Sequence, residues 1–198
     1  RDQAKFFLTI YVLISSIRLT NGNVCEPVSA GNSSVDDVPS IRQALAKCGN
    51  GGKIVIPLGR TFTIRSPLNF QDCQSCDFQV EGTLKVSDDL DYWQGQTAFF
   101  VLPNVVGARF YSLTGLGLID GSGQAFWDYF AKNQTYQRPL LIQMANSSDV
   151  TFMRLSLKNP AFWFIFVTGN SKHVKFSQLI LSAISTSPSL PKNTHGFD

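Results

Sequence analysis

A 24-residue internal repeat constrains the fold of this chain more than any other feature. Asn146-Ser147 recurs as Asn170-Ser171, and four apolar positions recur at the same distance. A fixed period of this length indicates stacked structural units, each of which buries its apolar face on its neighbours. The recurring apolar pairs are Val150 and Val174, Phe152 and Phe176, Leu155 and Leu179, and Leu157 and Leu181.

A fainter copy of the pattern precedes the Asn146 copy by 42 residues rather than 24. The 18 additional residues predict an insertion over residues 121–138. The earlier copy consists of Asn104, Ala108, Phe110 and Leu113.

Short β-prone runs follow one another from residue 53 onward, with Gly, Asn, Pro and Ser between them. We therefore predict an all-β chain that forms a right-handed parallel β-helix, in which equivalent residues of successive coils stack in ladders. Asn146 and Asn170 would stack at a turn and hydrogen-bond through their amides. Leucine-rich repeats share the period, but their Leu-x-x-Leu-x-Leu line is absent. A β-sandwich is the alternative, although it would not require residues to recur in register. Residues 150–157 and 174–181 are each predicted as one strand.

One convincing helix precedes the strands. We expect Ser34 or Asp36 to cap it and Gly49 to follow its end. Its apolar residues lie on one face, as expected for a helix that covers a core. It would be either a lid on the end of the β structure or an ordinary surface helix. The apolar stripe consists of Val38, Ile41, Leu45 and Cys48.

The first 22 residues have the layout of a secretory signal peptide. Arg1 and Lys5 precede an apolar run over residues 6–14, and small and polar residues follow up to Gly22. The run is shorter than the roughly 20 residues that a membrane-spanning helix needs. We predict a leader over residues 1–22 and a β-helix domain over residues 23–198.

The charge pattern argues against nucleic acid as a partner. Residues 23–198 carry 14 basic and 13 acidic side chains, and no run of basic residues stands out. No further segment is long and apolar enough to span a membrane. We find no metal-binding constellation and no phosphate-binding glycine loop, and we expect no cofactor.

Four cysteines follow the leader, and secretion would favour disulfides. Three pairings are possible, of which the most local joins Cys25 to Cys48 and Cys73 to Cys76. Cys73-Gln-Ser-Cys76 has a rival interpretation as a redox or zinc motif, but the chain has only two His to complete a zinc site. Three sequons also suit a secreted protein, at Asn32, Asn133 and Asn146.

The last six residues, Asn193-Thr194-His195-Gly196-Phe197-Asp198, carry the main functional signal. They resemble the Asn-Thr-Asp-Gly-Phe-Asp signature of glycoside hydrolase family 28, the polygalacturonases and their relatives. Residues 51–57, 116–127 and 157–160 resemble further segments of that family in the right order. Residues 70–84 look most like its fungal exo-acting branch.

The resemblance implies inverting hydrolysis of pectin. One carboxyl donates a proton to the leaving oxygen, and carboxylates roughly 6.5–9.5 Å away activate water. It makes Asp198 a candidate catalytic residue and Asn193 a candidate substrate-binding residue. The family's adjacent Asp pair, its Gly-His-Gly and its Arg-x-Lys would follow Asp198.

His195 stands where the family has a carboxylate, which makes it a candidate catalytic residue with an open role. A neutral imidazole can accept a proton, although it offers one acceptor and a carboxylate offers two. Three interpretations stay open. These are a single-base change in the sequence record, a lineage with altered substrate or lost activity, and a working His base.

We therefore expect a secreted, monomeric hydrolase of polygalacturonan that cuts from the chain end. The alternatives are a rhamnogalacturonan or xylogalacturonan hydrolase of the same family, and an inactive β-helix that binds cell-wall polysaccharide. Adding 24 to Val174 gives Asp198, so we expect the chain to stop where a coil opens. An uncapped β-helix exposes edges. We thus expect an N-terminal fragment, inactive by itself.

Other residues carry weaker expectations. Trp93 and Trp127 are expected to pack an insertion against the body rather than to stack on sugar. His173 is expected at the surface near a turn, and Asp120 in a tight turn. Residues 162–167 are apolar on both faces, so half of their side chains should point out of the coil, under a loop or into a cleft.

Overall fold

The structure is a computed structural model that describes residues 22–198. The predicted signal peptide over residues 1–22 therefore lies outside the described residues, apart from Gly22. No helix within residues 22–198 is long and apolar enough to cross a bilayer.

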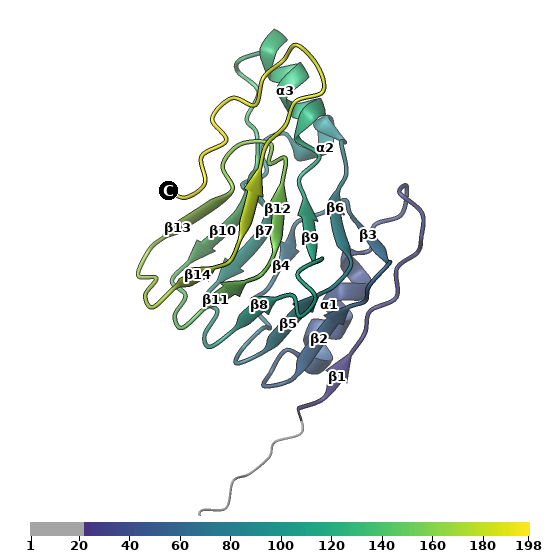
Figure 1. Ribbon diagram of the computed structural model, residues 1–198, viewed down its shortest axis with the longest axis vertical. Helices are drawn as coiled ribbons and strands as arrows, with labels where there is room; N and C mark the ends of the chain where they lie inside the picture. Colours follow the sequence, from purple (N-terminus) through teal and green to yellow (C-terminus); the bar gives the residue numbers. More distant parts are fainter. Residues whose placement is uncertain (1–21) are drawn as a thin grey trace, which may run out of the picture.

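Within residues 22–198 the strands form three parallel sheets that wrap around one core. Successive strands along the chain pass from sheet to sheet, so neighbours in one sheet come from successive coils (Figure 1). The predicted parallel β-helix is confirmed.

The six-stranded sheet contains, in order, β1 (Val24–Cys25), β2 (Lys53–Ile56), β5 (Asp77–Val80), β8 (Arg109–Tyr111), β11 (Thr151–Met153) and β14 (Lys175–Ser177). The five-stranded sheet contains β3 (Thr61–Ile64), β6 (Thr83–Val86), β9 (Leu118–Asp120), β12 (Ser156–Lys158) and β15 (Ile180–Ser182). The four-stranded sheet contains β4 (Leu68–Asn69), β7 (Ala98–Pro103), β10 (Leu140–Ala145) and β13 (Ile165–Thr168).

The repeat produces a ladder of phenylalanines inside the coils. Phe110, Phe152 and Phe176 are direct partners on neighbouring strands. The rings of Phe110 and Phe152 stack with centroids 4.6 Å apart, and those of Phe152 and Phe176 lie 5.6 Å apart. The stacking expected from the 24-residue spacing is therefore confirmed.

Two predicted strands are each broken in two. Residues 150–157 form β11 and β12, and residues 174–181 form β14 and β15. The break falls at Arg154 with φ 57° and at Gln178 with φ 52°. A residue with a left-handed backbone conformation turns the chain from one sheet to the next. The pattern of apolar residues gives no sign of this turn.

The leading helix is α1 (Val38–Cys48), and its predicted apolar stripe is buried. It packs against β1, β2, β3 and β4, the first strands of the three sheets, so it is a lid on one end of the stack. The N-cap position is occupied by Asp37 rather than by Ser34 or Asp36, although the Asp36 carboxylate accepts from the N–H of Val38, the first residue of the helix, at 3.2 Å. Asp37 makes no capping bond, since its carboxylate accepts from the backbone of Ala30 and Thr63 instead.

The predicted insertion is confirmed as a segment that carries α3 (Gly123–Lys132). Together with the short α2 (Leu90–Trp93) it covers the outer face near the start of the four-stranded sheet (Figure 1). Trp93 and Trp127 are buried there and donate to Ser87 Oγ and the carbonyl of Pro160, as expected for packing residues.

One predicted repeat position is wrong. Leu113 is exposed, and the register places Gly117 beside Leu155. A Cβ at Gly117 would collide with the carbonyl oxygen of Val80, and Leu155 of the next coil packs close to the same position. The turn between Ser112 and Gly117 is held by the buried carboxylate of Glu81. This carboxylate accepts hydrogen bonds from the backbone N–H groups of Leu113 and Thr114 and from the hydroxyls of Ser112 and Thr114.

The asparagine stack at the turn differs in detail from the prediction. The side-chain oxygen of Asn146 accepts from the backbone N–H of Asn170 at 3.1 Å, not from the side-chain amide of Asn170.

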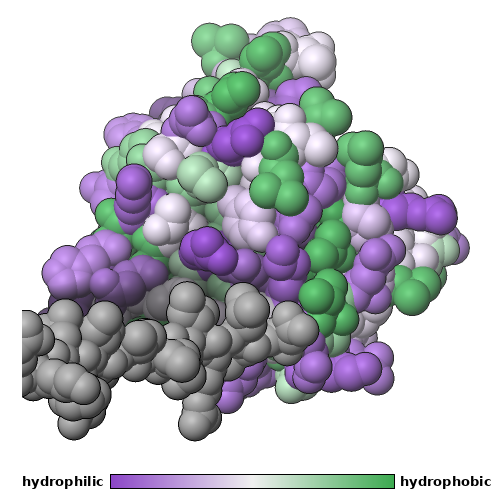
Figure 2. Space-filling model, turned by 60° about the horizontal axis from the view of Figure 1, so that its bottom comes forward, coloured by the Kyte–Doolittle hydropathy of each residue, from purple (hydrophilic) through white to green (hydrophobic). Residues whose placement is uncertain are grey.

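The disulfides pair Cys25 with Cys48 and Cys73 with Cys76, which is the most local of the three possibilities. Apolar and hydrophilic residues are interspersed on the face shown in Figure 2.

Candidate active site

The closing stretch lies along the outer strand of the four-stranded sheet. Phe197 is the parallel partner of Ile165 in β13, and the carbonyls of His195 and Gly196 accept from Phe164 and Ile165. Asp198 closes the ladder, because its N–H donates to the Ile165 carbonyl at 3.1 Å and its carbonyl accepts from Val167 N–H at 3.0 Å. The stretch therefore begins the next strand of this sheet.

This register corrects the expectation that Asp198 lies one coil on from Val174. Val174 precedes β14 in the six-stranded sheet, whereas Asp198 pairs with β13 in the four-stranded sheet. Phe197 follows its partner Ile165 by 32 residues, whereas Ile165 follows its partner Ile142 by 23. The loop over residues 183–192 takes up the difference.

The pleat places Asp198 on the outer face of the sheet. Ile165 is buried in the core, so its partner Phe197 faces inward, where its ring lies 4.9 Å from that of Phe176. Side chains alternate between faces along a strand, so Asp198 faces outward. By the strand register, Asp198 lies beside Phe166 of β13, which in turn is paired with Gln143 of β10.

His195 is exposed at the start of this strand. Its imidazole lies 6.2 Å from the ring of Trp163, between ring centroids. Trp163 in turn stacks on Phe162 at 4.8 Å. Phe162, Trp163 and Phe166 are half-buried, so the outward members of residues 162–167 form an aromatic surface next to His195 and Asp198.

Asn193 has φ 59°, and its side chain accepts a hydrogen bond from Arg138, the last residue of the insertion. Arg138 Nη2 donates to Asn193 Oδ1 at 3.2 Å, while Nη1 donates to the carbonyls of Ala161 at 3.0 Å and Lys192 at 2.7 Å. The guanidinium carbon lies 3.8 Å from the centroid of the Phe130 ring. Burial lowers the pKa of Arg138 to about 10.

Arg138 was not anticipated from the sequence. It is a single basic residue at the end of an insertion, and no motif marks it. Only an indirect sequence signal points to Arg138. A buried guanidinium needs several hydrogen-bond acceptors, and the loop before residues 193–198 offers backbone carbonyls that can serve as acceptors.

The other candidates are placed as follows. His173 is exposed near a turn, with Nδ1 3.2 Å from an Asp149 oxygen, as expected. Asp120 is the last residue of β9 rather than a turn residue, and its carboxylate accepts from Ser122 N–H just after the strand. Among residues 22–198, no three His, Cys, Asp or Glu side chains converge. The sequons at Asn32 and Asn146 are exposed and that at Asn133 is half-buried, and their glycosylation stays a prediction.

The fold is a right-handed parallel β-helix, and the closing stretch lies at the edge of its four-stranded sheet, with Asp198 on the outer face. Residues 48–198 match the family described as Glycosyl hydrolases family 28. The chain belongs to this family.

Relatives and solved structures agree with that assignment. Over 175 residues the chain is 48% identical to Endo-xylogalacturonan hydrolase A of Aspergillus tubingensis, which covers 88% of this chain and 43% of the relative. The probable endo-xylogalacturonan hydrolase A of Aspergillus niger is 47% identical, with the same coverage. The chain thus spans about 43% of the length of these relatives.

The crystal structure of the Aspergillus tubingensis enzyme superposes with a TM-score of 0.88, over 89% of this chain and 47% of that one. The polygalacturonase from Erwinia carotovora ssp. carotovora has a TM-score of 0.71 at 18% identity, over 90% of this chain and 52% of that one. This second likeness concerns the fold alone.

Proposed function

We propose that the protein to which this chain belongs is a hydrolase of xylogalacturonan, the pectic polymer named in its relatives' descriptions. The observation that carries the proposal is the placement of the family signature. Asp198 faces outward from a sheet edge beside an aromatic surface, and His195 lies three residues before it next to the same surface. The 48% identity to an endo-xylogalacturonan hydrolase supports this substrate over plain polygalacturonan.

The proposed chemistry is inverting hydrolysis. Asp198 would act on the attacking water or the leaving oxygen, because an outward carboxylate on a rigid strand can reach a polysaccharide laid across the sheet. Asn193 would contact the substrate through its amide nitrogen, since Arg138 already occupies its oxygen. His195 would stand in the position of a second acid–base group.

The mode of cleavage that we propose differs from the one expected from sequence. Chain-end cleavage gains no support from the relatives, whose names describe endo-acting enzymes. We propose internal cleavage. An open sheet face, rather than a closed pocket, is what an internal segment of a polymer needs.

The secreted, monomeric state belongs to the same proposal. Both disulfides suit an oxidising compartment, and three sequons suit passage through a secretory pathway.

A second candidate is an inactive protein that binds pectic polysaccharide through the same face. One observation favours it, namely His195 at the carboxylate position. An imidazole is bulkier than a carboxylate and supplies one acceptor rather than two.

The test is a substrate comparison with the full-length protein that contains this chain. Reducing-sugar release is measured on xylogalacturonan, on polygalacturonan and on the same xylogalacturonan after its xylose has been removed. We expect the highest kcat/KM on intact xylogalacturonan and a rapid fall in viscosity, which reports internal cleavage. Binding of all three polymers without release of reducing ends would favour the inactive protein. Preference for polygalacturonan would overturn the proposed substrate.

A further inference from the structure

A hollow lies on a different face from the candidate active site. It has a volume of about 1000 Å³ and lies over the outer face of the five-stranded sheet, between the loop before α1 and the start of α3. Its lining includes none of the residues of the four-stranded sheet and none of residues 193–198. Seven Ser and Thr residues line it, namely Ser29, Ser33, Ser34, Thr61, Thr63, Ser87 and Ser122.

One wall of this hollow is held by a buried carboxylate. Asp37 is 3% exposed. Its Oδ1 accepts from Ala30 N–H at 2.7 Å, and its Oδ2 accepts from Thr63 N–H at 2.8 Å and from Ser29 Oγ at 3.2 Å. These bonds fasten the loop before α1 to β3, so the wall is part of the folded body.

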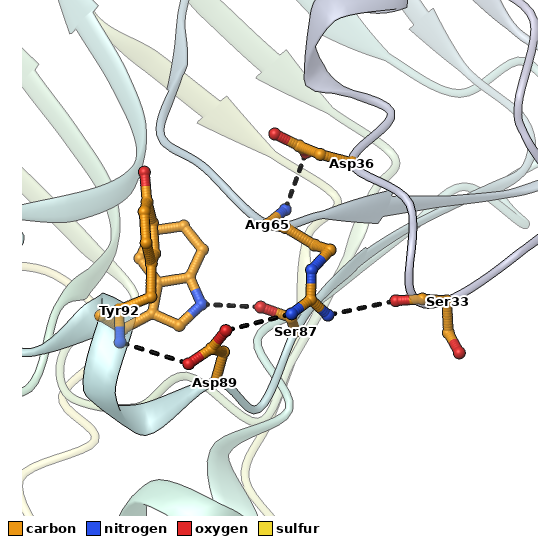
Figure 3. A network of polar contacts seen from close by, with 7 residues as sticks. Ser33, Asp36, Arg65, Ser87, Asp89 and Tyr92 are labelled. Atoms are coloured by element: carbon orange, nitrogen blue, oxygen red, sulfur yellow. Dashed lines mark hydrogen bonds and ion pairs between the residues drawn. The ribbon is translucent and has the colours of Figure 1, made fainter.

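Arg65 joins this wall to the opposite one (Figure 3). Its backbone N–H donates to Asp36 Oδ1 at 2.9 Å. Its Nη1 donates to the carbonyl of Ser33 at 3.2 Å, and its Nη2 contacts Asp89 Oδ2 at 3.0 Å. Asp89 caps α2, so one guanidinium spans from the first loop to the second helix. A hollow with walls fixed in this way needs little ordering when it binds a ligand.

The floor and rim carry charges of both signs. Lys85 lies on the floor between its strand partners Thr63 and Asp120, and Arg60 and Asp88 also line the hollow. Within residues 22–198, none of these four charged side chains takes part in an ion pair. Arg60 and Lys85 are exposed, so both cations are open to a ligand.

We propose that this hollow is a second, non-catalytic site for an acidic oligosaccharide. The two cations suit a uronate carboxylate, since charge-assisted hydrogen bonds to a carboxylate are stronger than neutral ones. The exposed hydroxyls of Ser33, Ser34 and Thr61 and the carboxylates of Asp88 and Asp120 suit sugar hydroxyls, which both donate and accept. A volume of this size accommodates a short oligosaccharide. The proposal does not depend on whether the candidate active site is catalytic.

Asn32 lies on the rim of the hollow. Its side chain accepts from Ser34 N–H at 2.9 Å and it heads a sequon, so a glycan there would compete with a bound oligosaccharide. The test therefore uses protein from which N-glycans have been removed enzymatically.

Binding of trigalacturonate is measured by calorimetry on the full-length protein that carries Asp198→Asn, so that cleavage does not confuse the titration. The double variant Arg60→Ser/Lys85→Ser is compared with a matched control, Lys172→Ser/Lys175→Ser. The control removes two exposed positive charges from residues that do not line the hollow. Thermal unfolding of both checks that the fold is unchanged.

We expect Arg60→Ser/Lys85→Ser to lose one binding site, or to bind at least tenfold more weakly, while the control binds like the parent. We expect maltotriose, a neutral trisaccharide, not to compete. Equal binding by the two double variants would overturn the site. Competition by maltotriose at equal concentration would overturn its selectivity for acidic sugars.

Discussion

The guanidinium of Arg138 donates a hydrogen bond of 3.2 Å to the side-chain oxygen of Asn193, which lies 55 residues further along the chain. The insertion that carries α3 thereby reaches the first residue of the family signature. The same guanidinium holds the carbonyls of Ala161 and Lys192. We infer that Arg138 is a positioning residue, which sets the direction of the closing stretch before it joins β13.

Replacing Arg138 by Met should destabilise the protein by about 2–3 kcal/mol, because three acceptors would lose a charged donor while the apolar contact is kept. Thermal or urea unfolding measures this loss. Arg138→Lys is the control. It should recover only part of the lost unfolding free energy, because the compact ammonium group lacks the planar guanidinium that reaches all three acceptors. An unchanged unfolding midpoint in Arg138→Met would contradict the positioning role.

Glu81 should make folding sensitive to acid. Burial raises its pKa, but the hydrogen bonds from Thr114, Leu113 and Ser112 outweigh this and lower its pKa from 4.5 to about 2. A depressed folded-state pKa contributes stability that is fully present above about pH 4.5 and is lost as the pH falls towards 2. Urea midpoints between pH 2 and 6 should therefore fall more steeply in the parent than in Glu81→Gln. Parallel curves for the two proteins would show that the carboxylate does not supply this dependence.

The phenylalanine ladder should be most sensitive at its centre. Phe152 is buried between two rings, so Phe152→Ala should cost about 3–5 kcal/mol. Phe176→Ala is the matched control, and it should cost less because Phe176 is half-buried. Equal losses of unfolding free energy would mean that the ladder is not packed as described.

Sequence predicted the coils well because their signal is periodic. Val150, Phe152 and Leu155 recur at the spacing of one coil, and the three are buried in the structure. Periodicity fails where coils change length. The turn held by Glu81 and the loop over residues 183–192 add residues that do not follow the apolar repeat, so the 24-residue spacing predicts the wrong positions for Leu113 and Asp198.

The site was predicted only in part, for a similar reason. The signature identified Asn193, His195 and Asp198, because a short motif is local in sequence. Arg138 and the aromatic surface at Trp163 come from other coils, and only the register of the four-stranded sheet brings them to the motif.

The role of His195 can be decided by restoring the family's carboxylate. His195→Asp in the full-length protein should raise the rate of xylogalacturonan hydrolysis at pH 4.5 by about tenfold or more, because a positioned acid–base group contributes about 10²–10⁴-fold and a carboxylate fits this position better. Initial rates of reducing-sugar release measure the change. A slower His195→Asp variant would instead identify the imidazole as the working group.

The central claim is that the closing stretch is one edge of a catalytic site, and Asp198→Asn tests it most directly. The substitution keeps the size of the side chain and removes its charge. We predict that kcat on xylogalacturonan falls by about 100-fold or more, while the unfolding temperature stays within about 2 °C of the parent. An unchanged kcat in a folded Asp198→Asn protein would contradict the account.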